Sequence, residues 1–330
     1  MNPRKHIIVT ATPLRVSFAG GGTDIENYYK HHTGCVLSTT INKYIYVTVK
    51  EHGELFEEPV RLNYSETEIV NSIDEVKNNI ARECIKLLDV KPPIYISTIA
   101  DLPAKSGLGS SSSFAVGLLN ALHAFKGETI TCGQLAEEAA YIEINVLGEP
   151  IGKQDQYAAA FGGFNFYSFH KDGEVSIEAK NIGINTLLEN TMFFWTGISR
   201  KAGVVLAEQK AKSLDNIKRL DAIKSHAENL SDLLKRDFAL TDIGKVLDAT
   251  WRQKRELANS ISSDQLDEYY QIAMDAGALG GKISGAGGGG FFMFIVPKER
   301  QKEVRKALHK MEQLSVGYEP YGSRILFPSV

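Results

Sequence analysis

The stretch Ser106–Phe114, SGLGSSSSF, decides how the rest of the chain is interpreted. Five of its nine residues are serines and two are glycines, and apolar side chains recur at helical spacing directly after it, over residues 114–125. Glycine lets a backbone approach a ligand closely, and a following helix adds free N–H groups and the positive end of its dipole. Because the next segment is so apolar, a flexible linker is excluded. A phosphate-binding loop and a serine-rich helix cap both remain open.

The bulk composition is that of a folded globular protein. The 330 residues are 43% hydrophobic and 23% charged, enough for one large or two medium domains. The net charge of -3 provides no basic field, so we expect neither a nucleic acid nor a membrane as partner. The three cysteines lack metal-ligand spacing and are expected to be reduced thiols. The first residues carry too short an apolar run for a signal peptide or a membrane span, so a cytoplasmic location is expected.

Strands and helices alternate in the first half, whereas the second half is mostly helical. The expected strands are 6–10, 35–49, 94–99, 162–169 and 291–296, and the expected helices are 74–89, 114–125, 131–147, 200–237, 240–261, 264–279 and 299–314. A composition change near residues 180–192 suggests a boundary. The pattern predicts an α+β protein with two lobes, and a site between lobes is a common arrangement.

Two further clusters of small residues accompany the serine-rich stretch. They are Ala19–Asp24 (AGGGTD) and Gly280–Gly290 (GGKISGAGGGG), and each by itself is typical of a turn. Gly285, Gly287 and Gly290 match the spacing G-x-G-x-x-G. However, this cluster is expected between a helix and a strand, whereas a dinucleotide fingerprint follows a strand and opens a helix. A dinucleotide site is therefore not expected.

Together the three clusters resemble the motifs of the GHMP small-molecule kinases. The matching stretches are PLRVSFAGGGTD (13–24), LPAKSGLGSSSSF (102–114) and KISGAGGGGFF (282–292), in the family's order and spacing over nearly the whole chain. RVSFAGGGTD, GEPIGKQDQYAAAFGG and TGISRKA are most similar to bacterial sugar 1-kinases that act on D-glycero-D-manno-heptose 7-phosphate. The resemblance implies an ATP-binding N-terminal lobe, residues 1–185, with a ribosomal protein S5 domain 2-like fold. It implies a ferredoxin-like C-terminal lobe over residues 186–330.

The resemblance also implies where ATP and Mg²⁺ bind. The ATP phosphates would lie on the serine-rich loop, formed by Ser106, Gly107, Leu108, Gly109, Ser110, Ser111 and Ser112. The metal ligands would be Ser111 and Glu143, with Glu137, Glu138 and Glu149 as nearby competitors and a solvated helix carboxylate as the plain alternative.

For the acceptor, the resemblance implies that Asp155 is the base and Arg15 its cationic partner. A simple helix cap and an ordinary strand-end arginine are the alternatives. Sugar recognition would come from Gly21, Gly22, Thr23 and Asp24, with Gly287 and Gly288 closing from the second lobe. Arg200 is the candidate for the substrate phosphate, and its rivals are Lys201, Arg252 and Lys254.

The predicted protein is thus an ATP- and Mg²⁺-dependent kinase of a small sugar phosphate, with a homodimer as a candidate assembly. A kinase for an unphosphorylated sugar such as fucose or galactose is the alternative within the class. A non-catalytic sugar sensor on the same fold is the alternative from another class. Because Ser111, Glu143, Asp155 and Arg15 are all retained, the kinase is favoured.

Overall fold

The computed structural model describes residues 7–53, 55–104, 106–180, 183–198, 202–212, 216–235 and 238–327. The strands are β1 (Ile8–Ala19), β2 (Gly34–Glu51), β3 (Val60–Asn63), β4 (Thr67–Val70), β5 (Ile94–Ala100), β6 (Phe164–Phe169), β7 (Val175–Ala179), β8 (Thr191–Trp195), β9 (Gly280–Ile283), β10 (Phe291–Ile295), β11 (Glu312–Leu314) and β12 (Arg324–Phe327). The helices are α1 (Glu26–Tyr29), α2 (Asn79–Leu87), α3 (Ser110–Lys126), α4 (Cys132–Ala140), α5 (Gln154–Phe161), α6 (Ile184–Glu189), α7 (Ala202–Ala211), α8 (Ile217–Leu233), α9 (Leu240–Arg255), α10 (Asp264–Asp275) and α11 (Gln301–Ala307). A π-helical segment, η2 (Tyr141–Val146), follows α4.

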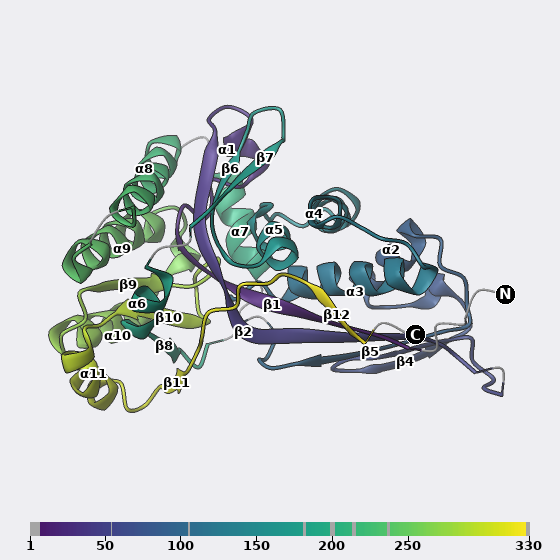
Figure 1. Cartoon of the computed structure of the whole chain (residues 1–330). Coiled ribbons are helices and arrows are strands. Elements are labelled where there is room, and N and C mark those ends of the chain that lie inside the picture. The colour runs from purple at the N-terminus through teal and green to yellow at the C-terminus, as the bar shows by residue number, and fades with distance from the viewer. Residues whose placement is uncertain are drawn as a thin grey trace.

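The larger sheet is built around the long antiparallel pair β1 and β2. Within the described residues it has eight strands in the order β12-β1-β2-β5-β3-β4, and β6 and β7 extend from β2. Ile45, Val47 and Val49 of β2 are buried while the residues between them are less so, the alternation of a sheet with one face on a core. Helices α2 to α5 lie on one side of this sheet (Figure 1).

Helix α3 is the central element of the first lobe. All of its residues from Ala115 to Ala124 are buried, because it packs against the sheet on one side and against other helices on the other. It ends at Gly127, which has a φ of 82° and confirms the predicted C-terminal glycine. A helix buried this completely holds its N-terminus at a fixed point relative to β1.

The second sheet gives the other lobe its ferredoxin-like order. Its four described strands are antiparallel in the order β11-β8-β10-β9, which in chain order is fourth, first, third, second. The core beside it contains several large aromatic side chains, among them Phe194, Trp251, Phe292 and Phe294. The predicted two-lobed α+β fold is confirmed in both lobes.

The chain returns to the first sheet at its end. Strand β12 pairs antiparallel with β1, with Ile325 opposite Thr10. The expected second lobe of residues 186–330 therefore gives its last described strand to the first sheet. Figure 1 shows this strand in yellow beside the purple β1.

Several predicted elements differ in their bounds or type. The helix expected over 299–314 is wrong in its second half, where β11 pairs with β8. The helices expected over 200–237 and 131–147 are each divided, the first into α7 and α8 and the second into α4 and η2. The glycine cluster at 280–290 is wrong as a helix-to-strand link, because its first residues form β9 and the rest connects β9 to β10, which pair with each other. No helix follows the cluster directly, so the dinucleotide fingerprint stays excluded.

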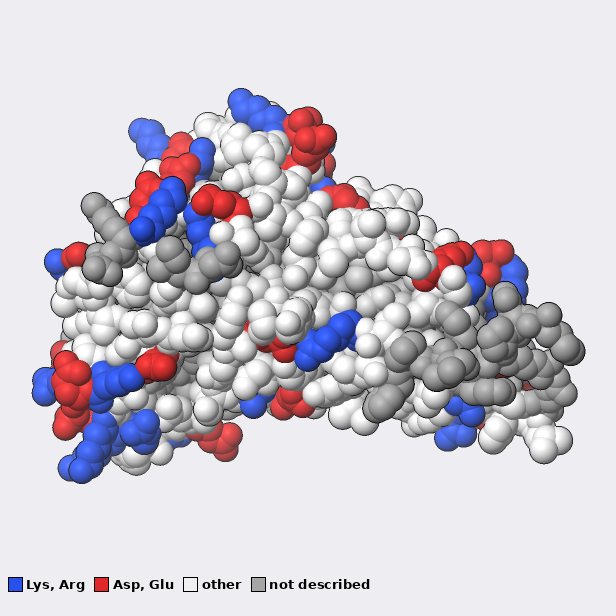
Figure 2. All heavy atoms as spheres, in the orientation of Figure 1, with Lys and Arg blue, Asp and Glu red and all other residues white. Residues whose placement is uncertain are grey.

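The surface visible in Figure 2 carries mixed charges. Lysines and arginines lie beside aspartates and glutamates at both ends of the view, at its top and near its centre, so no large area of one sign is visible. Within the described ranges, no helix is long and apolar enough to cross a membrane.

Candidate active site

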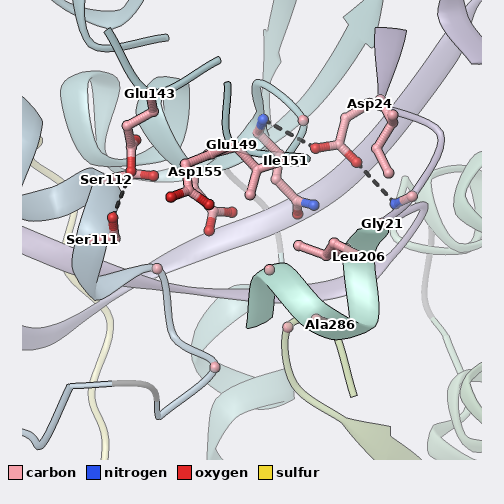
Figure 3. A pocket seen from close by; sticks show the side chains of 18 of the residues that line it. Gly21, Asp24, Ser111, Ser112, Glu143, Glu149, Ile151, Asp155, Leu206 and Ala286 are labelled. Carbon is pink, nitrogen blue, oxygen red and sulfur yellow. Dashed lines mark hydrogen bonds between the residues drawn. The ribbon is translucent and has the colours of Figure 1, made fainter. Parts of the chain in front are cut away.

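The three small-residue clusters meet in one cavity of about 520 Å³. Its lining comes from segments far apart in the sequence, which include Arg15, Gly21, Gly22, Asp24, Gly107, Gly109, Ser110, Ser111, Ser112, Glu143, Asp155, Leu206, Gln209, Lys254, Gly285 and Ala286. Figure 3 shows Ser111 and Glu143 at one end, Asp24 at the other, and Asp155 between them. The serine-rich loop thus faces a cavity.

The serine-rich loop is anchored through its backbone. The Arg15 N–H donates to the Leu108 carbonyl at 3.1 Å, and the Ser113 hydroxyl donates to the Pro13 carbonyl at 2.8 Å. Gly109 precedes α3 with a φ of 80°, and no described side chain caps the helix. The first-turn N–H groups of a helix have no intrahelical partners. The absence of a side-chain cap favours the phosphate-binding loop over the helix cap that the sequence left open.

The third cluster packs directly on this loop. A Cβ on Gly107 would lie 2.7 Å from the Ser284 carbonyl oxygen, and one on Gly285 would lie 2.5 Å from the Gly107 carbonyl oxygen. Such contacts permit glycine alone. In addition, the buried Lys282 ammonium donates to the Ser17 carbonyl at 2.6 Å. The two lobes are therefore joined by backbone packing at the cavity.

Arg15 and Asp155 form a bidentate ion pair. Arg15 Nε donates to Asp155 Oδ1 at 2.7 Å, and Nη2 donates to Oδ2 at 2.6 Å. The remaining Nη1 donates to the Gly107 carbonyl at 2.8 Å. The Asp155 side chain is 22% exposed, against 5% for Arg15. Arg15 thus holds the carboxylate beside the start of α3, where a Cβ on Gly109 would lie 3.3 Å from Asp155 Oδ2.

Ser111 and Glu143 meet across two helical segments. Ser111 Oγ donates to Glu143 Oε1 at 2.6 Å, and Gln156 Nε2 donates to Oε2 at 2.6 Å. Glu143 lies in the π-helical segment, a distortion that is frequent at functional sites. Burial raises the pKa of Glu143, and the hydrogen bond from Ser111 opposes the shift. A buried carboxylate oxygen beside a hydroxyl oxygen is a donor set that fits Mg²⁺.

The competing glutamates are occupied elsewhere or lie further along the wall. Glu137 accepts from Tyr157 and Lys153, and Glu138 accepts from His123. Glu149 lines the cavity. Of these carboxylates, Glu143 is the one bonded to the serine-rich loop.

Asp24 is the buried carboxylate at the other end of the cavity. Its Oδ1 accepts the Gly22 N–H at 2.9 Å and its Oδ2 accepts the Gln154 N–H at 3.3 Å. Burial raises the pKa of Asp24, and the hydrogen bond from Gly22 opposes the shift. Gly152 permits this arrangement, since a Cβ there would lie 2.0 Å from Asp24 Oδ2.

Some predicted site residues do not line the cavity. Thr23 is buried and its hydroxyl donates to the Gly20 and Cys35 carbonyls. Gly287 and Gly288 pack against Ile261, so Gly285 and Ala286 are the third-cluster residues at the cavity instead.

The other predicted residues are buried beneath the cavity wall, lie on the surface or fall outside the described ranges. Ser106 and Leu108 are fully buried. Arg252 is exposed and pairs with Asp248. Arg200 and Lys201 lie outside the described residues.

The structure adds residues that the sequence patterns did not single out. Gln154, Leu206 and Gln209 line the cavity, and none belongs to a small-residue motif. Lys254, named only as a rival for the substrate phosphate, is buried on α9 and donates to the Gly285 carbonyl. Burial lowers the pKa of Lys254 to about 8. Thr250 and Trp251, one helical turn before Lys254, are also buried. The position of Lys254 on this buried face of α9 is the local feature that could have indicated its burial.

Comparison with known proteins gives the same family from independent stretches of the chain. The family model for the GHMP kinases N terminal domain matches residues 73–163, and the model for GHMP kinases C terminal matches residues 229–313. A D-glycero-alpha-D-manno-heptose 7-phosphate kinase of Campylobacter jejuni is 36% identical over 318 residues, covering 92% of this chain and 93% of that protein.

Solved structures agree with this match. A D-glycero-D-manno-heptose 1-phosphate kinase from Bacteroides thetaiotaomicron is 26% identical with a TM-score of 0.78, covering 97% of this chain and 99% of that one. A Lactococcus lactis galactokinase in complex with galactose shares the fold, with a TM-score of 0.73 at 16% identity over 98% of this chain and 96% of that one. The motifs, the cavity and these matches show that the chain belongs to the GHMP kinases and is a phosphotransferase that uses an alcohol group as acceptor.

Proposed function

We propose that the protein transfers the γ-phosphoryl group of ATP to the anomeric C1 hydroxyl of D-glycero-D-manno-heptose 7-phosphate. The observation that carries the chemistry is the bidentate Arg15–Asp155 pair at the start of α3. The relative from Campylobacter jejuni, named for a heptose 7-phosphate, supports the acceptor. The product would be the 1,7-bisphosphate, a precursor of nucleotide-activated heptose for surface polysaccharides.

Asp155 would act as the general base. Both of its oxygens accept from Arg15, and each retains a lone pair that can accept the proton of the acceptor hydroxyl. The freed oxygen attacks the γ-phosphorus, the bond from that phosphorus to the bridging oxygen breaks, and ADP leaves. Arg15 keeps the carboxylate oriented and stabilises negative charge on the transferring group.

The N–H groups at the start of α3 and in the serine-rich loop would bind the phosphates. Ser111 and Glu143 would hold Mg²⁺, because a hydroxyl and a buried carboxylate already lie 2.6 Å apart there. The bound cation would neutralise phosphate charge. Asp24, at the far end of the cavity, would accept a hydrogen bond from a sugar hydroxyl, while Arg200 or Lys254 would contact the substrate phosphate.

The test is the product formed from ATP, Mg²⁺ and D-glycero-D-manno-heptose 7-phosphate. We expect ADP release and a new phosphomonoester on C1, identified by phosphorus NMR. Fucose, galactose and unphosphorylated heptose serve as comparison acceptors. A free sugar preferred by a wide margin would overturn the heptose phosphate assignment, and tight sugar binding without ADP from any acceptor would indicate the sensor instead.

A further inference from the structure

Helix α7 forms one wall of the cavity and carries a buried amide whose nitrogen donates to none of the described residues. Gly203, Leu206 and Gln209, spaced three apart on one face of α7, all line the cavity. Gln209 is 2% exposed, and its Nε2 has no hydrogen-bond partner within the described ranges. An unpaired buried donor is costly, so such groups need an explanation.

The amide lies against the first cluster. A Cβ on Gly22 would be 2.4 Å from Gln209 Nε2, so the missing side chain of Gly22 makes room for the amide. The N–H of the same Gly22 donates to Asp24 Oδ1 at 2.9 Å. A buried donor and a buried carboxylate therefore flank one glycine at the end of the cavity away from Ser111, the end at which Figure 3 shows Asp24 and Leu206.

The chemistry of this corner fits a hydroxyl group better than a phosphate. A hydroxyl both donates and accepts, so it can donate to Asp24 and accept from Gln209. A phosphate would be repelled by the carboxylate and would need a cation. Among the described lining residues the cations are Arg15 and Lys254, and these are bonded to Asp155, Gly107 and Gly285 instead.

We propose that Gln209 determines acceptor specificity by donating from Nε2 to a sugar hydroxyl whose proton is accepted by Asp24. This proposal rests on the proposed function only in that the acceptor is a sugar. Helix α7, which lies outside the three glycine-rich motifs, would then take part in recognising the acceptor sugar. This role of Gln209 also explains the close approach of Gly22, since any side chain there would displace the amide.

The test compares Gln209→Leu with wild type and with Ala207→Leu, which introduces the same side chain at an exposed position of the same helix. Losing a hydrogen bond to a buried site is expected to lower kcat/KM for the acceptor by about 10- to 100-fold. The KM for ATP should stay within about twofold, and Ala207→Leu should match wild type. Gln209→Glu keeps the shape, places a second acceptor group beside Asp24 and should lose at least as much.

Singly deoxygenated analogues of heptose 7-phosphate then identify the hydroxyl. For one analogue, wild type and Gln209→Leu should have equal kcat/KM, because the contact is already absent. The proposal is overturned if Gln209→Leu retains full activity, if its loss is the same for every analogue, or if the KM for ATP rises in parallel. A failure of the proposed function shows in wild type alone, and the same ratios are then measured with the sugar that wild type prefers.

Discussion

The two ends of the cavity are built in different ways. At the end that would hold ATP, one contiguous stretch, Gly107–Ser112, supplies most of the wall, and the backbone of β1 and the third cluster fix it in place. At the acceptor end, Asp24, Gln154 and Gln209 come from three separate segments and contribute side chains. Backbone donors suit phosphate, whereas side chains can be adapted to one acceptor. We therefore expect the site to divide into a part that binds phosphate and a part that sets the acceptor.

The largest effect is expected where the two ends meet, at Asp155. Asp155→Asn should lower kcat by about 10³-fold, because the amide cannot take the hydroxyl proton. ATP affinity, measured by calorimetry, should change little, since the phosphate-binding loop is untouched. Asp172→Asn, at an exposed turn, is the matched control and should retain full activity. Full turnover in Asp155→Asn would remove the base assignment and leave Asp155 as a structural partner of Arg15.

Ser111 and Ser113 lie two residues apart, and we expect Ser111 to bind a ligand and Ser113 to hold the structure together. Ser111→Ala should lower kcat/KM for ATP by about 10- to 100-fold, because it removes an oxygen beside Glu143. Ser113→Ala should keep its activity but lose about 1 kcal/mol of stability, because its buried hydroxyl holds the Pro13 carbonyl. Steady-state kinetics and thermal unfolding separate the two. Equal losses of activity would mean that the loop acts only as a structural cap.

The part of the site that was predictable follows the same division. Gly107, Gly109 and Ser110 to Ser112 were expected together, because residues that would contact one phosphate through the backbone are neighbours in the sequence, and the structure places all five at the cavity. Asp155 and Glu143 needed the family resemblance, since a carboxylate on a helix has no local signature of its own. Gln209 could not be found, because an isolated glutamine on a helix is typical of a surface residue.

For the fold as well, only elements with a local sequence pattern could be predicted. The buried helix α3 and the long strand β2 were predicted because their patterns are local, whereas β1 was predicted only over its first residues. Strands β11 and β12 were not, since a strand of three or four residues is defined by its partner, β8 for one and β1 for the other. Short elements in this chain are fixed by tertiary pairing more than by their own residues.

Lys254 tests whether the second lobe positions the phosphate loop through Gly285. Lys254→Met keeps the length of the side chain but removes the bond to the Gly285 carbonyl, so kcat/KM should fall by about 10- to 100-fold. Stability should not fall with it, because burial of the ammonium lowers the pKa of Lys254 to about 8, below its ordinary 10.5.

The difference in free energy of unfolding between wild type and Lys254→Met should change with pH in a definite direction. Between about pH 8 and 10.5 the unfolded chain binds the Lys254 proton and the folded chain does not, so wild-type stability rises with pH. Lys254→Met lacks this gain. Any stability advantage of the variant should therefore shrink across this window in thermal unfolding followed by circular dichroism. A constant difference would mean that Lys254 is not buried as an isolated charge.

The smallest effect is expected at the far end of α3, where the same helix has no part in the cavity. His123 is buried in the last turns, and its Nδ1 and Nε2 lie 2.8 Å from Glu128 and Glu138. The hydrogen bond to Glu138 raises the pKa of His123 above the ordinary histidine value of 6.5. The protonated ring therefore stabilises the fold in full at a pH below 6.5. That contribution is lost as the pH rises through the raised pKa.

His123→Asn should therefore reduce the free energy of unfolding by about 1–2 kcal/mol below pH 6.5, and the difference from wild type should narrow at alkaline pH. His309→Asn, at an exposed histidine, is the control. The kcat of His123→Asn should equal that of wild type, because α3 is held along its length by the sheet and the start of the helix needs no support from its end. A fall in kcat would show that the two ends of α3 are coupled, and that the division between a binding end and a structural end does not hold along this helix.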